Sequence, residues 1–135
     1  MTDATAFPVF PTTAPAVFCD PDATRLLFGD VLGRLAAVVD LDEEQLDLAT
    51  PCAGFTAAQL RQHVLGWLGF FAAALRDPGA ASPRPDPESF ELAGGELASD
   101  VVGRCLVEIG QAVADDAAGQ MVTMTSSRMA GDGVL

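Results

Sequence analysis

The fold is decided by one stretch of the sequence, Thr56-Ala-Ala-Gln59-Leu-Arg-Gln-His63-Val-Leu-Gly-Trp67-Leu-Gly-Phe-Phe71. A Thr followed three residues later by Gln is the capping-box pattern that opens a helix. Apolar side chains then recur at steps of three and four residues, which places them on one face of that helix. The stretch therefore predicts an amphipathic helix with His63 in the middle of its apolar face.

Two further helices are expected outward from this one. Asp20-Pro21 offers an N-cap followed by Pro at the first helical position, and an apolar stripe then continues to a helix end near Asp40. A third helix is predicted over roughly Glu96 to Ala118. Its apolar stripe consists of Leu97, Val101, Val102, Cys105, Ile109 and Val113. Three such helices, each with one apolar stripe, indicate an all-α helical bundle.

The remaining segments are connectors or short extended pieces. Residues 1–19 are rich in Pro and are expected to form an extended arm, and residues 20–135 are expected to form the helical domain. Residues 77–95 hold several Pro and Gly residues and predict a long loop. Met121 to Thr125 favours a short strand or extended piece, and Met129 to Leu135 has the character of a lead-in to another helix.

The charge of the chain limits its partners. It has 135 residues, 19 of them Asp or Glu against 7 basic residues, for a formal net charge of −12. All the basic residues are Arg and none form a cluster, so a nucleic-acid backbone or an anionic membrane surface would be repelled. The longest apolar stretch, Val64 to Leu75, is about half a membrane span. We therefore expect one domain with no nucleic-acid or membrane partner.

The cysteines indicate a reducing compartment. Cys19, Cys52 and Cys105 are an odd number without a CxxC pair, and no signal peptide is visible. A cytoplasmic protein with free thiols is expected. Cys105 falls on a core stripe, whereas Cys52 is interpreted either as a small buried turn residue, the favoured alternative, or as a thiolate stabilised by the following helix N-terminus.

His63 is the only histidine, and the pattern alone favours a hydrogen-bonded core residue over a metal ligand. A zinc site needs about three protein ligands, and no second histidine exists to contribute. The residues taken by themselves leave both interpretations open.

A resemblance to a known family bears on this choice. Thr50-Pro-Cys-Ala-Gly-Phe-Thr56, followed by Gln59-Leu-Arg-Gln-His63-Val-Leu-Gly-Trp67, resembles the "TPCPGWTVRDLVAHVLG" stretch of the DinB-like metalloprotein superfamily. It is similar in particular to the actinobacterial branch that includes the N-terminal domain of mycothiol-dependent maleylpyruvate isomerase. The resemblance implies a four-helix bundle with a divalent metal in its core, most often zinc, and it places His63 at the position of one metal ligand.

The chain departs from that family at its C-terminal end. The resemblance implies two further ligands, His or Glu, from a fourth helix resembling "E-x-x-x-H-G-W-D-L", and no segment here matches it. The fourth helix is then either truncated or supplied by another chain. Three explanations stay open: a piece of a longer protein, which is favoured; a metal-free module; or two chains that form a homodimer through an exposed apolar groove and share a metal between their His63 residues.

Two functions follow as expectations. The first is a divalent-metal-binding protein resembling thiol-dependent isomerases and transferases, in which the metal activates a small-molecule thiol or a water. The second is a non-catalytic helical module that binds a partner or a second copy without a metal.

Overall fold

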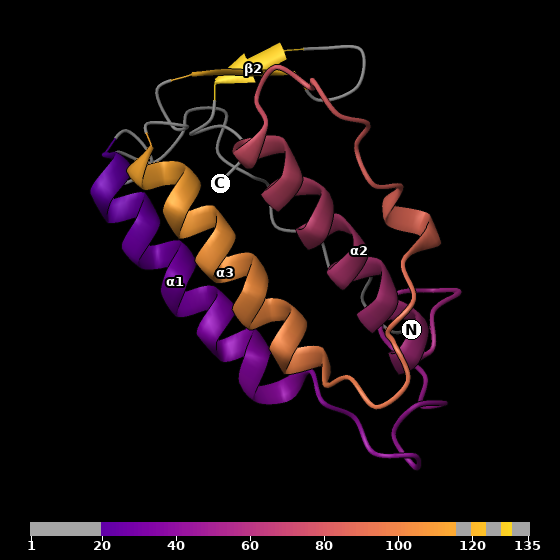
Figure 1. Ribbon diagram of the computed structural model, residues 1–135. Coiled ribbons are helices and arrows are strands. Elements are labelled where there is room, and N and C mark those ends of the chain that lie inside the picture. The colour runs from indigo at the N-terminus through magenta and orange to yellow at the C-terminus, as the bar shows by residue number, and fades with distance from the viewer. Residues whose placement is uncertain (1–19, 116–119, 124–127, 131–135) are drawn as a thin grey trace, which may run out of the picture.

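The computed structural model describes residues 20–115, 120–123 and 128–130. The expected all-α fold with three long helices is confirmed, and a short hairpin follows them (Figure 1). The elements are α1 (Pro21–Val38), α2 (Ala57–Arg76), the 3-10 helix η2 (Pro87–Ser89), α3 (Ala98–Ala114), β1 (Met121–Thr123) and β2 (Arg128–Ala130). The expected arm of residues 1–19 lies outside the described residues, so its boundary with the helical domain stays a prediction.

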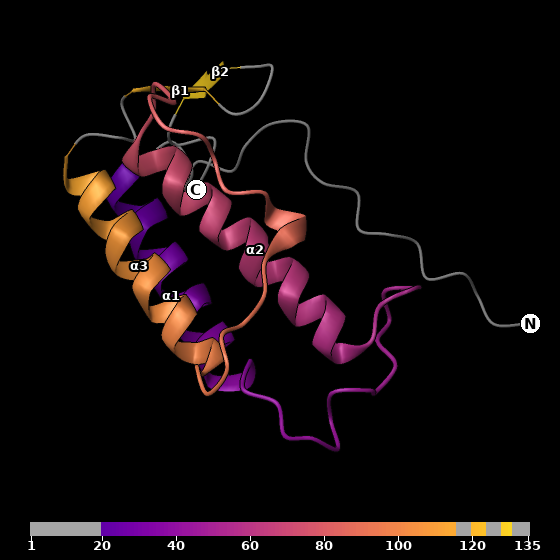
Figure 2. The same ribbon diagram turned by 45° about the vertical axis from the view of Figure 1, so that its right-hand side comes forward.

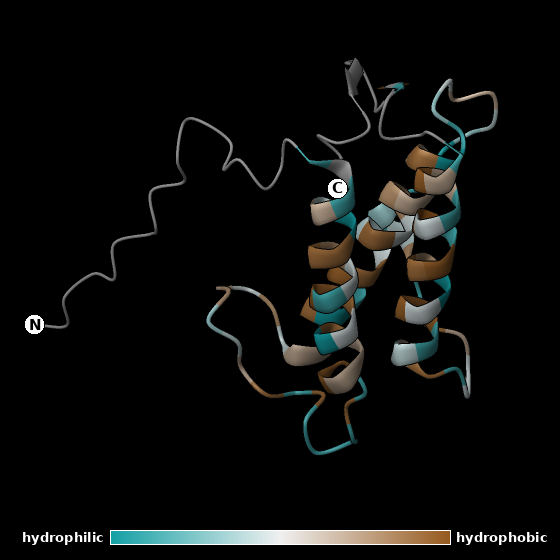
Figure 3. Cartoon of the chain, turned by 90° about the vertical axis from the view of Figure 1, so that its left-hand side faces the viewer, coloured by the Kyte–Doolittle hydropathy of each residue, from teal (hydrophilic) through white to brown (hydrophobic). Residues whose placement is uncertain are grey.

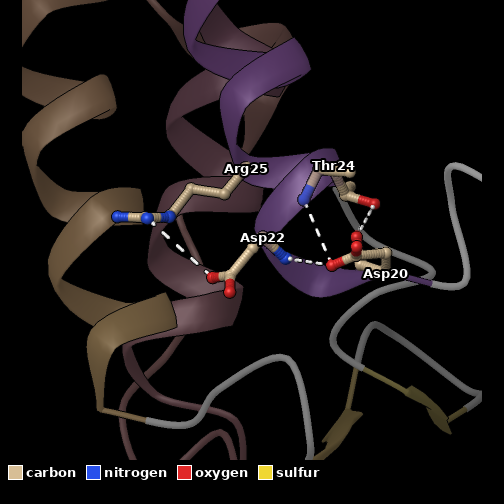
Figure 4. Close-up of polar contacts among 5 residues, drawn as sticks. Asp20, Asp22, Thr24 and Arg25 are labelled. Atoms are coloured by element: carbon tan, nitrogen blue, oxygen red, sulfur yellow. Dashed lines mark hydrogen bonds and ion pairs between the residues drawn. The ribbon is translucent and has the colours of Figure 1, made fainter.

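The start of α1 has the predicted cap. Asp20 Oδ1 accepts hydrogen bonds from the backbone N–H groups of Asp22 at 3.0 Å and Ala23 at 3.3 Å (Figure 4). The Thr24 hydroxyl donates to the Asp20 carbonyl oxygen at 3.0 Å. These bonds satisfy groups that the first helical turn leaves without helical partners, so α1 begins at Pro21.

The capping box of α2 is also confirmed. Thr56 Oγ1 accepts from the Gln59 backbone N–H at 3.3 Å, and Gln59 Oε1 accepts from the Thr56 N–H at 2.9 Å. This reciprocal pair fixes the first turn of the helix that carries His63.

The start of α3 is capped from outside the helix. Its own N-cap residue, Leu97, makes no side-chain cap, and the helix begins two residues after the predicted Glu96. Asp40, just beyond α1, accepts from the Ser99 N–H at 3.0 Å and from the Ser99 hydroxyl at 2.5 Å. The hydroxyl and N–H of Ser99 hold the pKa of the Asp40 carboxyl below its usual value. The end of α1 is thereby tied to the start of α3.

The helix directions explain the long loop. α1 runs opposite to α2 and α3, and the segment between α2 and α3 returns along the length of α2 (Figures 1 and 2). Since α2 has 20 residues and is about 30 Å long, a connection between helices that point the same way must be long. This return path brings η2 against the middle of α2.

The C-terminal hairpin corrects one prediction. β1 pairs antiparallel with β2, with Val122 opposite Met129. The expected extended piece is confirmed over Met121 to Thr123, but Met129 and Ala130 belong to a strand, so their assignment to a helix lead-in is wrong. Residues 131–135 lie outside the described part. Val122 is fully buried against the helices, so β1 closes one end of the core.

The core lies where α3 packs against both α1 and α2. Each helix carries hydrophobic and hydrophilic residues (Figure 3). The larger buried side chains are Leu32, Val39, Leu65, Leu68, Phe70, Leu75, Val101, Val102, Cys105, Ile109 and Val122. On α2 the buried stripe is Leu65, Leu68, Ala72 and Leu75. The predicted apolar face is instead Leu60, His63, Val64, Trp67, Leu68 and Phe71, and of these only Leu68 is buried. The prediction chose a neighbouring stripe because α2 is apolar around most of its circumference.

Among the residues that the structure describes, no helix combines the length and the apolar composition that a membrane crossing requires.

Candidate functional site

The face of α2 predicted to be core instead forms a partly exposed site around His63. The imidazole ring lies between two aromatic rings, with centroid distances of 5.3 Å to Phe55 and 6.4 Å to Trp67. Trp67 in turn contacts Phe70 and Phe71 at 5.4 and 5.8 Å. These contacts fix the position of the His63 ring on the helix surface.

A carboxylate from the long loop faces the ring. Oε1 of Glu88 lies 3.2 Å from Nδ1 of His63 and accepts a hydrogen bond from Nε1 of Trp67 at 3.1 Å. Nδ1 is buried. The angle between it and the Glu88 oxygen is too poor for a regular hydrogen bond, and Nδ1 has no other hydrogen-bond partner among the described residues. The His63 side chain is nevertheless 37% exposed. Its open edge is therefore the one away from Nδ1, which leaves Nε2 as the nitrogen available to a ligand.

The local fold of the loop explains why Glu88 reaches this point. Asp86 caps η2, its Oδ1 accepting from the Glu88 N–H at 3.0 Å, and Pro87 occupies the first helical position. η2 then rests on Gly66 of α2, where an added Cβ would lie 2.0 Å from the Pro87 carbonyl oxygen. Gly66 is therefore the contact that lets the loop bring Glu88 down onto His63 and Trp67.

The turn before α2 places Phe55 against the same ring. The Thr50 hydroxyl donates to the Phe55 carbonyl oxygen at 2.9 Å and accepts from the Cys52 N–H at 3.2 Å. Gly54 has φ +88°, a conformation that favours glycine. Cys52 is exposed, so its favoured interpretation as a small buried turn residue is wrong about burial although right about the turn. Cys105 is buried, as predicted, and burial raises the pKa of its thiol.

A small pocket opens beside His63. It has a volume of about 220 Å³, and its walls combine the imidazole and the Glu88 carboxylate with amide and aromatic side chains. Its lining is Gly54, Phe55, Gln59, Gln62, His63, Glu88 and Phe90. The pocket can admit a few non-hydrogen atoms next to the imidazole, and it offers amide groups to orient them.

The residues around His63 fit one part of a metal site. A metal-ligating histidine normally turns its other ring nitrogen to a carboxylate or carbonyl, as Nδ1 of His63 faces Glu88. Within the described ranges, however, no three His, Cys, Asp or Glu side chains lie together as a ligand group. Among the described residues His63 is therefore a candidate ligand without a complete ligand set.

A larger hollow of about 660 Å³ lies along the C-terminal half of α2. Its two arginines already have partners: Nη1 of Arg76 lies 3.1 Å from Oε2 of Glu108, and Nη1 of Arg84 donates to the Ala73 carbonyl oxygen at 2.9 Å. These contacts fix the end of α2 and the loop that follows it, and His63 has no part in them.

Sequence reasoning identified His63 and missed Glu88. The Asp86-Pro87-Glu88 sequence is a cap followed by Pro at the first helical position, so the short helix could have been found. The contact of this short helix with Gly66 could not have been predicted, because no local sequence pattern indicates where a loop of this length packs against the preceding helix.

Comparison with known families supports the resemblance that rested on residues 50–67. A family model described as the mycothiol maleylpyruvate isomerase N-terminal domain matches residues 28–128, a range that holds the whole site. The comparisons with curated proteins and with solved structures give no match.

Proposed function

Because the chain belongs to the mycothiol maleylpyruvate isomerase N-terminal domain family, we propose that it binds a divalent metal ion, most readily zinc, through His63. The remaining ligands would come from outside the described residues, on the same or another chain. In this proposal the domain serves thiol-dependent isomerase or transferase chemistry on a small molecule.

The single observation that carries the proposal is the setting of His63. Its ring is held between Phe55 and Trp67, Nδ1 is buried toward Glu88, and the other edge is open beside a pocket. A histidine that only filled the core would be enclosed on all sides, and this one is not. A single accessible ring nitrogen on a rigid helix is what a metal ligand requires.

A bound divalent metal would supply a Lewis acid that lowers the pKa of a coordinated thiol or water. The chain's own residues have other tasks. His63 would hold the ion, Phe55 and Trp67 would keep bulk water from two sides of the ring, and the amides of Gln59 and Gln62 would orient what enters the pocket. The free thiols of Cys52 and Cys105 and a thiol co-substrate both suit a reducing cytoplasm, where we place the protein.

Cobalt substitution tests this function. The metal is removed with a chelator, Co²⁺ is added, and the absorption spectrum is recorded before and after addition of mycothiol. We expect a new near-ultraviolet band from thiolate-to-cobalt charge transfer, and its loss in His63→Ala. Gln111→Ala, an exposed residue of α3 that does not line this pocket, is the control and should keep the band. A spectrum that mycothiol leaves unchanged would contradict thiol activation.

A second candidate function rests on a separate surface. Between α1 and α2 lies an apolar hollow of about 210 Å³, and Val38 at its rim is 69% exposed. Its apolar lining includes Leu35, Val38, Val39, Leu41, Leu60 and Val64. Exposed apolar area of this kind favours association, here with a second copy of the chain.

Sedimentation velocity over a range of concentrations tests the dimer. Val38→Lys should abolish it, whereas Val107→Lys should not, since Val107 is 60% exposed on α3 and is not part of the hollow. A compact monomer at every concentration would contradict this candidate.

A further inference from the structure

The side chain of Glu88, in the loop between α2 and α3, is 63% exposed, yet one of its oxygens contacts two side chains of α2. One of its oxygens faces Nδ1 of His63 at 3.2 Å and accepts from the indole N–H of Trp67 at 3.1 Å. The hydrogen bond from Trp67 orients the carboxylate, and the close packing of η2 on Gly66 fixes the backbone that carries it. The acid is therefore held in place from two directions.

We propose that Glu88 is a positioning residue that selects the tautomer of His63. A neutral imidazole carries its proton on either Nδ1 or Nε2, and the partner of one nitrogen decides which. A carboxylate accepts and cannot donate while ionised, so Glu88 stabilises the form with the proton on Nδ1. The lone pair is then on Nε2, at the open edge of the ring.

The consequence for metal binding rests on the proposed function. A metal needs a ring nitrogen with a free lone pair, and Glu88 keeps that lone pair on the accessible nitrogen before the ion arrives. The same contact holds the ring in one orientation, which lowers the entropy lost on binding. At 3.2 Å the negative charge of the carboxylate favours a proton on Nδ1 in the metal-free protein, even though the alignment falls short of a regular hydrogen bond.

Other groups near the ring do not compete for this role. Gln59 uses its side-chain oxygen in the capping box, and the side chain of Phe55, whose ring is tilted by 54° to the imidazole, has no hydrogen-bonding group. Glu91, on the same loop and exposed, makes no ion pair or hydrogen bond among the described residues. It therefore offers a control acid matched in charge and in loop position.

The test uses the fact that His63 is the only histidine. Nitrogen NMR of protein labelled at histidine reports its tautomer without assignment, in metal-free protein at a pH where the ring is neutral. The wild type should show the proton on Nδ1. Glu88→Ala should shift the population toward Nε2–H, Glu88→Gln should retain much of the wild-type state because it keeps an acceptor, and Glu91→Ala should change nothing. An unchanged tautomer in Glu88→Ala would overturn the proposal.

Zinc affinity of the same variants separates this proposal from the proposed function. We expect Glu88→Ala to weaken zinc binding by about 10- to 100-fold, as loss of such a carboxylate does elsewhere. Equal affinity in Glu88→Ala and wild type would contradict the link to metal binding. If His63→Ala leaves zinc binding intact, the proposed function fails, and the tautomer measurement still decides the role of Glu88.

Discussion

A Gly66→Ala substitution probes the contact that assembles the site. An alanine Cβ at position 66 would lie 2.0 Å from the Pro87 carbonyl oxygen and 2.9 Å from its carbonyl carbon. Real Cβ contacts are essentially never shorter than 3.0 Å, so the carbonyl oxygen must move away by at least 3.0 − 2.0 = 1.0 Å, and by 3.4 − 2.0 = 1.4 Å to reach ordinary van der Waals contact. A shift of this size would stretch the hydrogen bond between Trp67 and Glu88, which is now 3.1 Å.

The free energy of unfolding contains two opposing contributions. Replacing a helical glycine by alanine stabilises a helix by about 0.8–1 kcal/mol. Overpacking against a neighbouring backbone destabilises by about 1–3 kcal/mol. Gly69, one turn further along α2, has no neighbouring atom within 4 Å of the place that an alanine Cβ would take, and it therefore experiences only the first contribution. We expect Gly66→Ala to be less stable than Gly69→Ala by about 1–3 kcal/mol.

Urea unfolding followed by circular dichroism gives this difference. The fluorescence of Trp67, the only tryptophan, reports in the folded state whether Glu88 still contacts the indole. We expect the emission to change in Gly66→Ala and to stay as in the wild type in Gly69→Ala. If both variants are stabilised equally and their emission is the same, the close packing of η2 on α2 is refuted.

Three further predictions concern the frame around the site. Thr56→Ala removes the capping box and should lower the free energy of unfolding by about 1 kcal/mol in urea. The lowered pKa of Asp40 means that its bond to Ser99 stabilises the fold above about pH 3.8 and that this stabilisation is lost as the pH falls through the folded-state pKa. Unfolding measured over a range of pH should therefore show Asp40→Ala to be less stable than the wild type near neutral pH, and the difference in the free energy of unfolding should decrease in acid. A difference that does not depend on pH would contradict this. Iodoacetamide should modify exposed Cys52 in native protein well before buried Cys105, whose thiol pKa is raised, as peptide mass spectrometry can determine; equal rates would contradict the burial of Cys105.

Local signals in the sequence predicted the helices well. Asp20 and the Thr56–Gln59 pair act as caps where the pattern placed them, because the bonded groups of these two caps are only two or three residues apart. The start of α3 could not be placed from its own sequence, since the capping carboxylate of Asp40 comes from beyond α1. Leu97 was predicted to be a core residue of this helix. It is 55% exposed because it is the N-cap residue and precedes the first turn of α3.

The site was harder to predict than the fold. His63 was identified from a motif, but its face of α2 was taken for core because periodicity could not distinguish two adjoining apolar stripes. Glu88 lies 25 positions away in a loop, and its approach depends on the tertiary contact at Gly66. Interactions of this kind depend on the packed structure and leave no local pattern.

Metal content is the most direct test of the central claim, that His63 is a metal ligand. The full-length protein, purified without chelators, is analysed by inductively coupled plasma mass spectrometry beside His63→Ala and the pocket control Gln62→Ala. We expect about one equivalent of divalent metal in the wild type and in Gln62→Ala, and its loss in His63→Ala. The same metal content in His63→Ala as in the wild type would contradict it.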